Sequence, residues 1–277
     1  MLVRGVDLET LDRGHGRPFF WGHGLMGSMA QEDGAELLDW DELAACGRLV
    51  RFDARGHGRS EATLDPAGYR WSELARDLLA LADACGAERA VWGGASMGCA
   101  TALHAAVAAP ERTDALVLVI PPTAWKTRPR QARIYRGMAK MVDALGLAPL
   151  RWMVQLGGLA RVPEPLAQMQ RSFAESLRRA DRRAVAAAMR GAAASDLPPP
   201  DALATCEVPA LVLAWRGDPS HPVATAERLG ELLPQADVRI ADGLDDVRGW
   251  TGAIRSFLAE HEPARSGDGG RGLPVGG

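Results

Sequence analysis

VWGGASMGCA, at residues 91–100, is the most informative stretch of this chain, and it contains the pattern G-x-S-x-G at residues 94–98. Residues 89–92 before it predict a short strand, and residues 99–109 after it predict a helix. A serine on a sharp turn between strand and helix holds its hydroxyl out of the sheet, where a base can reach it, and flanking glycines make that turn without Cβ clashes. Ser96 is therefore a candidate nucleophile. Because the pattern alone also arises by chance in a chain rich in Gly and Ala, the other segments have to support it.

Strands and helices alternate through the first part of the chain. Residues 1–12 favour an edge strand or hairpin, and residues 35–46 and 71–85 favour helices. Apolar runs predict further strands at residues 17–21, 48–52 and 115–120. Such alternation is typical of an α/β protein whose mostly parallel sheet is covered by helices on both faces.

The alternation stops after residue 122. Residues 123–200 show helical patterns, at 130–145, 148–156, 164–179 and 181–194, with Asp181 as the expected N-cap of the last. The α/β pattern then resumes with a strand at 209–215, a helix at 223–233, a strand at 237–241 and a helix at 247–260. We therefore expect a core formed by residues 1–122 and 208–262, a helical lid at 123–207, and a disordered Gly-rich tail at 263–277.

Composition narrows the possible partners. The chain has a net charge of -3 and no long basic block, which argues against nucleic acid. Its four cysteines lack metal-type spacing and are expected to be free thiols in a reducing compartment, so we predict a cytoplasmic protein without metal or cofactor. The first residues do not resemble a signal peptide, and no apolar run approaches the length of a membrane span, so we also expect no membrane partner.

Four motifs together resemble one known family. They are GHGL at residues 22–25, DARGHGRS at 53–60, the serine turn at 94–98, and GDPSHP at 217–222 directly after a predicted strand. In this order and spacing they are similar to the α/β-hydrolase fold family, and the resemblance covers nearly all of residues 15–260. The predicted helical insertion also falls where that family carries its lid.

The resemblance implies a role for each matching residue. Ser96 is the expected nucleophile. The backbone N–H groups of Leu25 and Met97 are the expected donors of an oxyanion hole, where one lost donor costs about 3–4 kcal/mol of activation barrier. Asp218 is the expected acid that orients a histidine.

The chain departs from the family at the catalytic base. The family's histidine lies in the loop after the last strand, and residues 239–250 contain none. Without a base, a serine hydroxyl keeps its proton and is a weak nucleophile. His221, three residues after Asp218, is the tentative replacement, and a turn residue before a proline is the alternative reading.

The remaining candidates for a base are weaker. Asp245 and Asp246 lie near the family's histidine position but fit a solvated helix N-terminus better. His104 falls about two helical turns beyond Ser96, too far along the helix axis to reach its hydroxyl. Four other histidines are expected to brace the backbone, to form scaffold or to lie far from the site: His15, His23, His57 and His261.

The predicted lid is rich in Arg at its start and in Met and Trp throughout. A Met- and Trp-bearing surface facing Ser96 would favour a partly apolar small-molecule substrate, although helix packing explains the same residues. The arginines could meet an acidic group or form an exposed face. These residues are Arg128, Arg130, Arg133, Arg136, Trp125, Trp152, Met138, Met141, Met153, Met169 and Met189.

The sequence favours a serine hydrolase of ester, thioester or related carbonyl substrates that uses Ser96, Asp218 and His221. Two alternatives remain open: a hydrolase-fold protein that binds a small ligand without hydrolysis, and a lyase or cyclase that uses the oxyanion site. The distance from Ser96 to the nearest imidazole separates the first reading from the others. The sequence predicts neither the substrate nor the oligomeric state.

Overall fold

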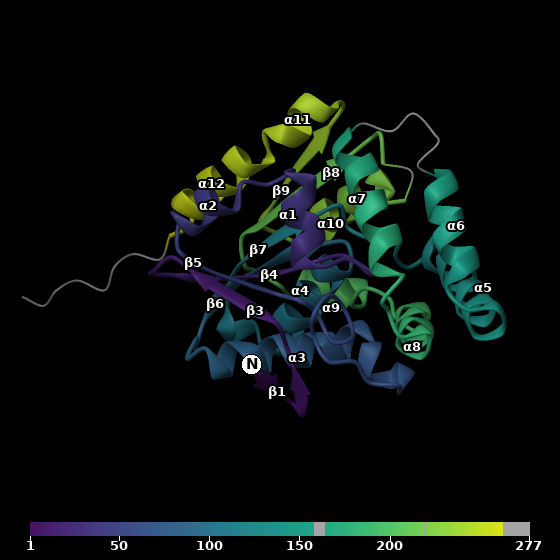
Figure 1. Ribbon diagram of the computed structural model, residues 1–277. Coiled ribbons are helices and arrows are strands. Elements are labelled where there is room, and N and C mark those ends of the chain that lie inside the picture. Colours follow the sequence, from purple (N-terminus) through teal and green to yellow (C-terminus); the bar gives the residue numbers. More distant parts are fainter. Residues whose placement is uncertain (158–163, 219, 263–277) are drawn as a thin grey trace, which may run out of the picture.

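The computed structural model describes residues 1–157, 164–218 and 220–262 of the 277-residue chain. The predicted disordered tail therefore lies outside the described residues. Because the motifs of the sequence, apart from Pro219 in the last of them, fall within the described ranges, the architecture around them can be followed in Figure 1.

A twisted sheet in the order β3-β5-β4-β6-β7-β8-β9 forms the centre of the molecule (Figure 1). β3 pairs antiparallel with β5, and the remaining pairings in this sheet are parallel. The strands are β3 (Thr10–Arg13), β4 (Pro18–Gly22), β5 (Arg48–Phe52), β6 (Ala90–Ala95), β7 (Thr113–Val119), β8 (Ala210–Trp215) and β9 (Ala236–Ala241). A separate hairpin of β1 (Leu2–Val3) and β2 (Val6–Asp7) precedes them. The predicted α/β class and mostly parallel sheet are confirmed.

Helices cover both faces of this sheet because successive side chains of each strand point to opposite faces, and both faces are apolar. Phe20 and Trp92 lie in the core on one face, whereas Phe19 and Val91 lie in the core on the other. The first face packs against α3 (Trp71–Ala84), α4 (Met97–Ala108) and α10 (Val223–Leu232), and the second against α2 (Trp40–Ala44) and α12 (Trp250–Glu260). Each fully buried large side chain contributes about 1.5–3 kcal/mol, so these two cores fix the positions of the strand ends.

The segment between β7 and β8 contains helices and no strand among its described residues. They are α5 (Arg128–Leu145), α6 (Ala148–Gly157), α7 (Glu164–Ser176), α8 (Arg182–Ala193) and α9 (Pro200–Ala204). Val142, Leu150 and Met189 belong to a small apolar core that this segment forms itself. Asp181 caps α8 as predicted, because its carboxylate accepts a hydrogen bond from the N–H of Arg183 at 2.8 Å.

Within the ranges described above, no helix has the length and apolar character needed to cross a membrane.

The helix predicted at residues 35–46 is wrong in its boundaries. Within that range only α2 is a helix, and α1 (Met29–Ala35), which was not predicted, ends where the range begins; Glu36 after it adopts the left-handed conformation with φ 49°. Ser28 caps α1 and Asp39 caps α2, so local capping side chains specify two short helices instead of one continuous helix. The predicted C-terminal helix is likewise divided into α11 (Leu244–Arg248) and α12, and the short α9 was missed. Two 3-10 helices, Pro66–Tyr69 and Pro110–Arg112, complete the elements of the described residues.

Candidate active site

Ser96 lies on the turn between β6 and α4, in the strand–turn–helix arrangement that the sequence predicts. Its backbone has φ 54° and ψ -104°, a left-handed conformation that is rare for any residue except glycine. A Cβ atom at Gly94 or Gly98 would collide with the carbonyl oxygen of Gly22 on β4. The two glycines therefore let the turn pack directly against the neighbouring strand, and this packing holds Ser96 in its strained conformation.

The loop after β8 brings Asp218 and His221 together. One oxygen of Asp218, Oδ1, accepts the backbone N–H groups of Ser220 at 2.7 Å and of His221 at 3.2 Å. This local turn folds the chain back, so that His221 Nδ1 lies 2.6 Å from Asp218 Oδ2. Pro222 follows at once at the N-cap position of α10, and a proline restricts the backbone of the residue before it, here His221.

His221 also reaches Ser96, which lies on a different part of the sheet. Its Nε2 is 2.8 Å from Ser96 Oγ. Because Nδ1 faces a carboxylate that can only accept, Nδ1 carries the proton in this arrangement and Nε2 has its lone pair free toward the serine hydroxyl. The serine and histidine lie 125 residues apart in the sequence.

The surroundings of Asp218 favour its ionised form. Burial by itself raises the pKa of this carboxyl, but the hydrogen bond and charge of His221 and the two backbone N–H groups lower it more. The net result is a pKa of Asp218 below its ordinary value. The carboxylate therefore stays charged at neutral pH and can hold the imidazole in one tautomer.

The turn that resembles the family's oxyanion turn lies beside Ser96. A Cβ at Gly24 would lie 3.5 Å from Ser96 Cβ, so the turn comes close to the serine at Gly24. Leu25 is the next residue of the chain. Leu25 makes no backbone hydrogen bond to any described residue. Met97 is the first residue of α4, where N–H groups have no acceptor within the helix. The N–H groups of Leu25 and Met97 thus belong to segments that lie next to Ser96, and neither has a backbone partner among the described residues.

Buried His23 braces this turn, and buried His57 packs against the His23 ring with the two ring centroids 5.2 Å apart. His23 Nδ1 lies 2.7 Å from the carbonyl oxygen of Gly24, and His23 Nε2 accepts the N–H of Ala54 at 3.0 Å. His57 Nδ1 lies 2.8 Å from the carbonyl oxygen of Arg55. Burial lowers the pKa of each imidazole to about 4, so both are neutral near pH 7. These contacts match the bracing and scaffold roles expected from the sequence.

The other candidate bases have contacts elsewhere. Asp246 accepts the backbone N–H groups of Asp242 and Gly243 at the start of α11, and Asp245 pairs with Arg248. His104 Nε2 lies 2.9 Å from the carbonyl oxygen of Asp196, at the base of the helical segment. In the loop where the family carries its histidine, this chain therefore has a carboxylate that accepts backbone N–H groups at the start of α11.

Arg128, Trp152 and the methionines of the helical segment divide into three groups. Arg128 is buried, stacks on Trp71 at 4.1 Å and donates to the carbonyl oxygens of Ser195 and Ala192, so its role is structural. Met138, Met141 and Met189 pack within the helical segment itself. Trp152 and Met153 are exposed, and the side chain of Met169 lies outside the described residues. For these residues the packing alternative holds more often than a surface facing Ser96.

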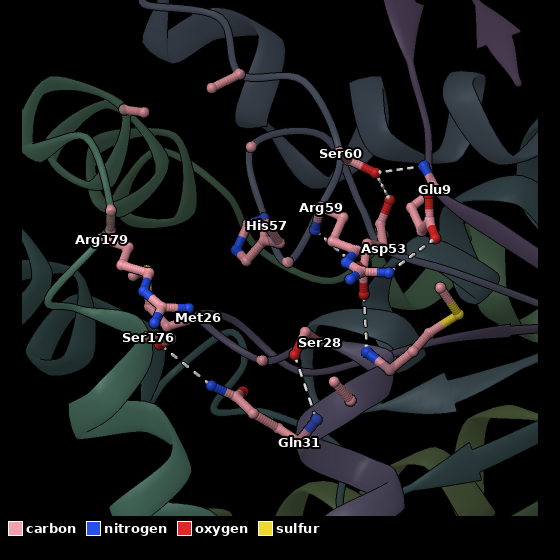
Figure 2. Close-up of a pocket in the computed structure, with 18 of the residues that line it drawn as sticks. Glu9, Met26, Ser28, Gln31, Asp53, His57, Arg59, Ser60, Ser176 and Arg179 are labelled. Carbon is pink, nitrogen blue, oxygen red and sulfur yellow. Dashed lines mark hydrogen bonds and ion pairs between the residues drawn. The ribbon is translucent and has the colours of Figure 1, made fainter.

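A cavity of about 790 Å³ lies between the 56–60 loop, the start of α1 and helices α7 and α8 (Figure 2). Met26 and Gly27 line it, but Ser96 and His221 do not, so it lies beyond the turn that carries Leu25. Figure 2 shows the His57 ring between the Arg59 and Arg179 side chains. The volume of this cavity is in the range of small-molecule pockets. Ser96, His221 and Asp218, however, lie outside it.

Sequence reasoning missed Cys99, which supports the serine turn from below. Its Sγ lies 3.0 Å from the carbonyl oxygens of both Gly94 and Val119, which lie near the ends of β6 and β7. Burial raises the pKa of this thiol, so it stays protonated and acts as a donor. No pattern in the sequence indicates this contact. In the described part of the chain, His, Cys, Asp and Glu side chains form no group of three or more that could hold a metal ion.

Comparisons with known proteins agree with this geometry. The family model of the alpha/beta hydrolase fold matches residues 23–247. A protein described as a candidate carbamate hydrolase, RutD, from Variovorax paradoxus is 32% identical over 74% of this chain and 72% of its own. A 3-oxoadipate enol-lactonase from Acinetobacter baylyi is 28% identical over 76% of this chain and 77% of its own. A thermophilic esterase from Thermogutta terrifontis superposes with a TM-score of 0.77 at 24% identity, covering 93% of this chain and 95% of the esterase, which shows the shared fold.

Proposed function

Because the chain belongs to the alpha/beta hydrolase fold family, we propose that it hydrolyses esters, thioesters or related carbonyl compounds with Ser96 as the nucleophile. In this proposal His221 is the base and Asp218 orients it. Leu25 and Met97 supply the two oxyanion N–H groups. One observation carries the proposal: the contact of 2.8 Å between Ser96 Oγ and His221 Nε2, with Asp218 on the far side of the imidazole.

The reaction follows from these contacts. As Ser96 Oγ attacks the carbonyl carbon, its proton moves to His221 Nε2, and negative charge develops on the carbonyl oxygen between the N–H groups of Leu25 and Met97. The protonated His221 then gives that proton to the leaving group, and the acyl group stays on Ser96. A water molecule, deprotonated by His221, attacks the acyl carbon, and the proton returns to Ser96 as the acid is released.

Lactones and carbamates are the first substrates to test beside simple esters. Relatives of this chain carry the names enol-lactonase and candidate carbamate hydrolase. Both groups are carbonyl compounds with a heteroatom leaving group, which the proposed mechanism requires. A partly apolar small molecule remains the expected substrate.

The absence of the family's histidine from its usual loop is the argument for a non-hydrolytic function. His221 weakens that argument, because its Nε2 lies within 2.6–3.2 Å of Ser96 Oγ, the distance that proton transfer needs. No contact among the described residues favours a lyase or a pure binding function over hydrolysis.

Ser96→Ala and His221→Ala test the proposal. The purified protein is labelled with a fluorophosphonate probe, and kcat and KM are measured on p-nitrophenyl esters, a lactone and a carbamate. We expect labelling to be lost in Ser96→Ala and kcat to fall about 10⁴-fold or more in both variants, since nucleophile and base act as one unit.

His261→Ala is the matched control, because this histidine also follows Asp218 but contacts Phe257 on α12. It should retain labelling and kcat. Labelling that survives in Ser96→Ala, or a His221→Ala variant that is folded and fully active, would refute the assignment.

A further inference from the structure

The outer face of helices α5 and α6 exposes large apolar side chains of the kind that proteins usually bury. Eight large apolar residues are exposed in the described part of the chain, and five of them lie on these two consecutive helices. They are Ile134, Leu145, Trp152, Met153 and Leu156, with exposed fractions from 40% to 67%. Figure 1 shows α5 and α6 at the edge of the molecule, farther from the sheet than α7 and α8. Such clustering marks an interaction surface, whereas scattered exposed residues do not.

The arrangement on α6 shows that this exposure follows from the helical pattern. Trp152, Met153 and Leu156 recur at the spacing of one helix face, and all three are exposed. Leu150 lies on another face of the same helix and is buried in the core of the helical segment. The helix thus has two apolar faces, of which the segment itself uses one.

The same two helices also carry a net positive charge. Residues 126–156 contain seven basic residues and one acidic residue, in a chain whose net charge is -3. Arg130, Arg133 and Lys140 are exposed and form no ion pair or hydrogen bond with any described residue. The acidic residue, Asp143, pairs with Arg190, and Arg128 is buried. The exposed cations of α5 therefore have no compensating charge on their own helix.

We propose that the outer face of α5 and α6 binds the surface of an anionic lipid membrane. Apolar side chains with a Trp among them enter the headgroup region of a bilayer, and Lys and Arg beside them pair with anionic headgroups. A two-fold contact between copies through this face would bring the cations of both together. A nucleic acid would pair with the cations but leave the aliphatic side chains in water. The contact is superficial and differs from spanning, which was the basis for expecting no membrane partner.

Vesicle cosedimentation of the full chain tests the proposal. We expect binding to phosphatidylcholine vesicles that contain phosphatidylglycerol, little binding to pure phosphatidylcholine, and a loss of binding as salt is raised. The double variant Met153→Ser with Leu156→Ser should lower the partition coefficient about tenfold or more. Arg130→Gln and Arg133→Gln should lower it about fivefold each.

The matched controls are exposed residues that lie outside the helical segment. Leu64 is as exposed as Met153, and Arg248 is an exposed cation on α11, so Leu64→Ser and Arg248→Gln should bind vesicles like wild type. Ser96→Ala should also bind like wild type, because the proposal does not depend on the chemistry of that residue. Circular dichroism checks that each variant is folded.

Three outcomes would overturn the proposal. The first is equal binding to neutral and anionic vesicles, and the second is unchanged binding in the α6 double variant. The third is an absence of vesicle binding together with a change of oligomeric state in that variant by light scattering, or with a gel shift of duplex DNA that depends on Arg130 and Arg133. In that case the face contacts a second copy or a nucleic acid.

Discussion

At the scale of single residues, Asp218 has two separate tasks. Its Oδ1 holds the turn by accepting two backbone N–H groups, and its Oδ2 faces His221 Nδ1. In the proposed mechanism the second contact fixes the tautomer that leaves Nε2 free to accept the proton of Ser96. A change that preserves the shape of the side chain but adds a donor separates the two tasks.

Asp218→Asn should lower kcat on an ester about 10³–10⁴-fold with little change in KM. The amide keeps an oxygen for the turn but can place an N–H against Nδ1, which favours the tautomer with its proton on Nε2. Steady-state kinetics measures both constants.

Asp246→Asn is the control at the position where the family carries its histidine. This carboxylate accepts the N–H groups of Asp242 and Gly243 and makes no contact with Ser96 or His221. We expect its kcat to match wild type. A loss as large as that of Asp218→Asn would mean that the α11 loop, and not the loop after β8, supplies the acid or base.

At the scale of elements, the serine turn depends on how closely α4 approaches β4. Gly98 lies in the first turn of α4, and a Cβ there would overlap the carbonyl group of Gly22. Neither strand nor helix can move away without loss, since Phe20 on β4 and Leu103 on α4 are fully buried.

Gly98→Ala should therefore destabilise the protein by about 1–3 kcal/mol, because the new methyl group overpacks a rigid contact. Urea unfolding, followed by circular dichroism, gives the free energy of unfolding. Labelling of Ser96 by a fluorophosphonate should fall as well, since the turn has to shift.

Gly137→Ala is the matched substitution on α5, where a Cβ would meet no atom within 4 Å. Alanine has the higher helix propensity, so this variant should gain about 0.5–1 kcal/mol. If Gly98→Ala were as stable as Gly137→Ala, the proposed close packing of the serine turn would be wrong.

At the scale of the whole molecule, stability should depend on pH through three buried groups. Burial lowers the pKa of His23 and of His57 to about 4, below the value near 6.5 of an unfolded chain. Between these values the unfolded state binds more protons, so each histidine makes the folded state less stable as pH falls from about 6.5 to 4. Burial raises the pKa of Glu32 to about 7, and this carboxyl acts in the opposite direction over a similar range.

His57→Gln should therefore reduce the acid-induced loss of stability between pH 7 and pH 4.5 by about 2 kcal/mol relative to wild type, and Glu32→Gln should increase that loss. The measurement is the free energy of unfolding in urea at pH 7 and at pH 4.5. His15→Gln, at an exposed position, serves as control and should show the wild-type change. A His57→Gln variant with the wild-type pH dependence would contradict the buried neutral state of His57.

The fold was predictable because its signals are local. Each of the four motifs is a short stretch whose glycines, prolines and apolar runs specify a turn beside a strand, and their order fixes the alternation of the sheet. Where local signals competed, the sequence-based prediction failed, as at residues 35–46, where Glu36 ends the preceding helix α1 in the left-handed conformation and Asp39 begins the shorter helix α2. Periodicity showed that α6 is apolar, but it could not show that Trp152 is exposed while Leu150 is buried.

The sequence by itself determined the class of the fold, the serine turn and the absence of the family's histidine from its usual loop. It could name His221 as a tentative base, since that residue lies three positions from Asp218. Only the tertiary structure placed His221 Nε2 within 2.8 Å of Ser96 Oγ, across 125 residues of chain. That distance depends on the ends of β6 and β8, which lie on either side of β7 in one sheet, and on the buried cores that hold them there. Local sequence patterns carry no information on such a separation, because it results from packing between elements.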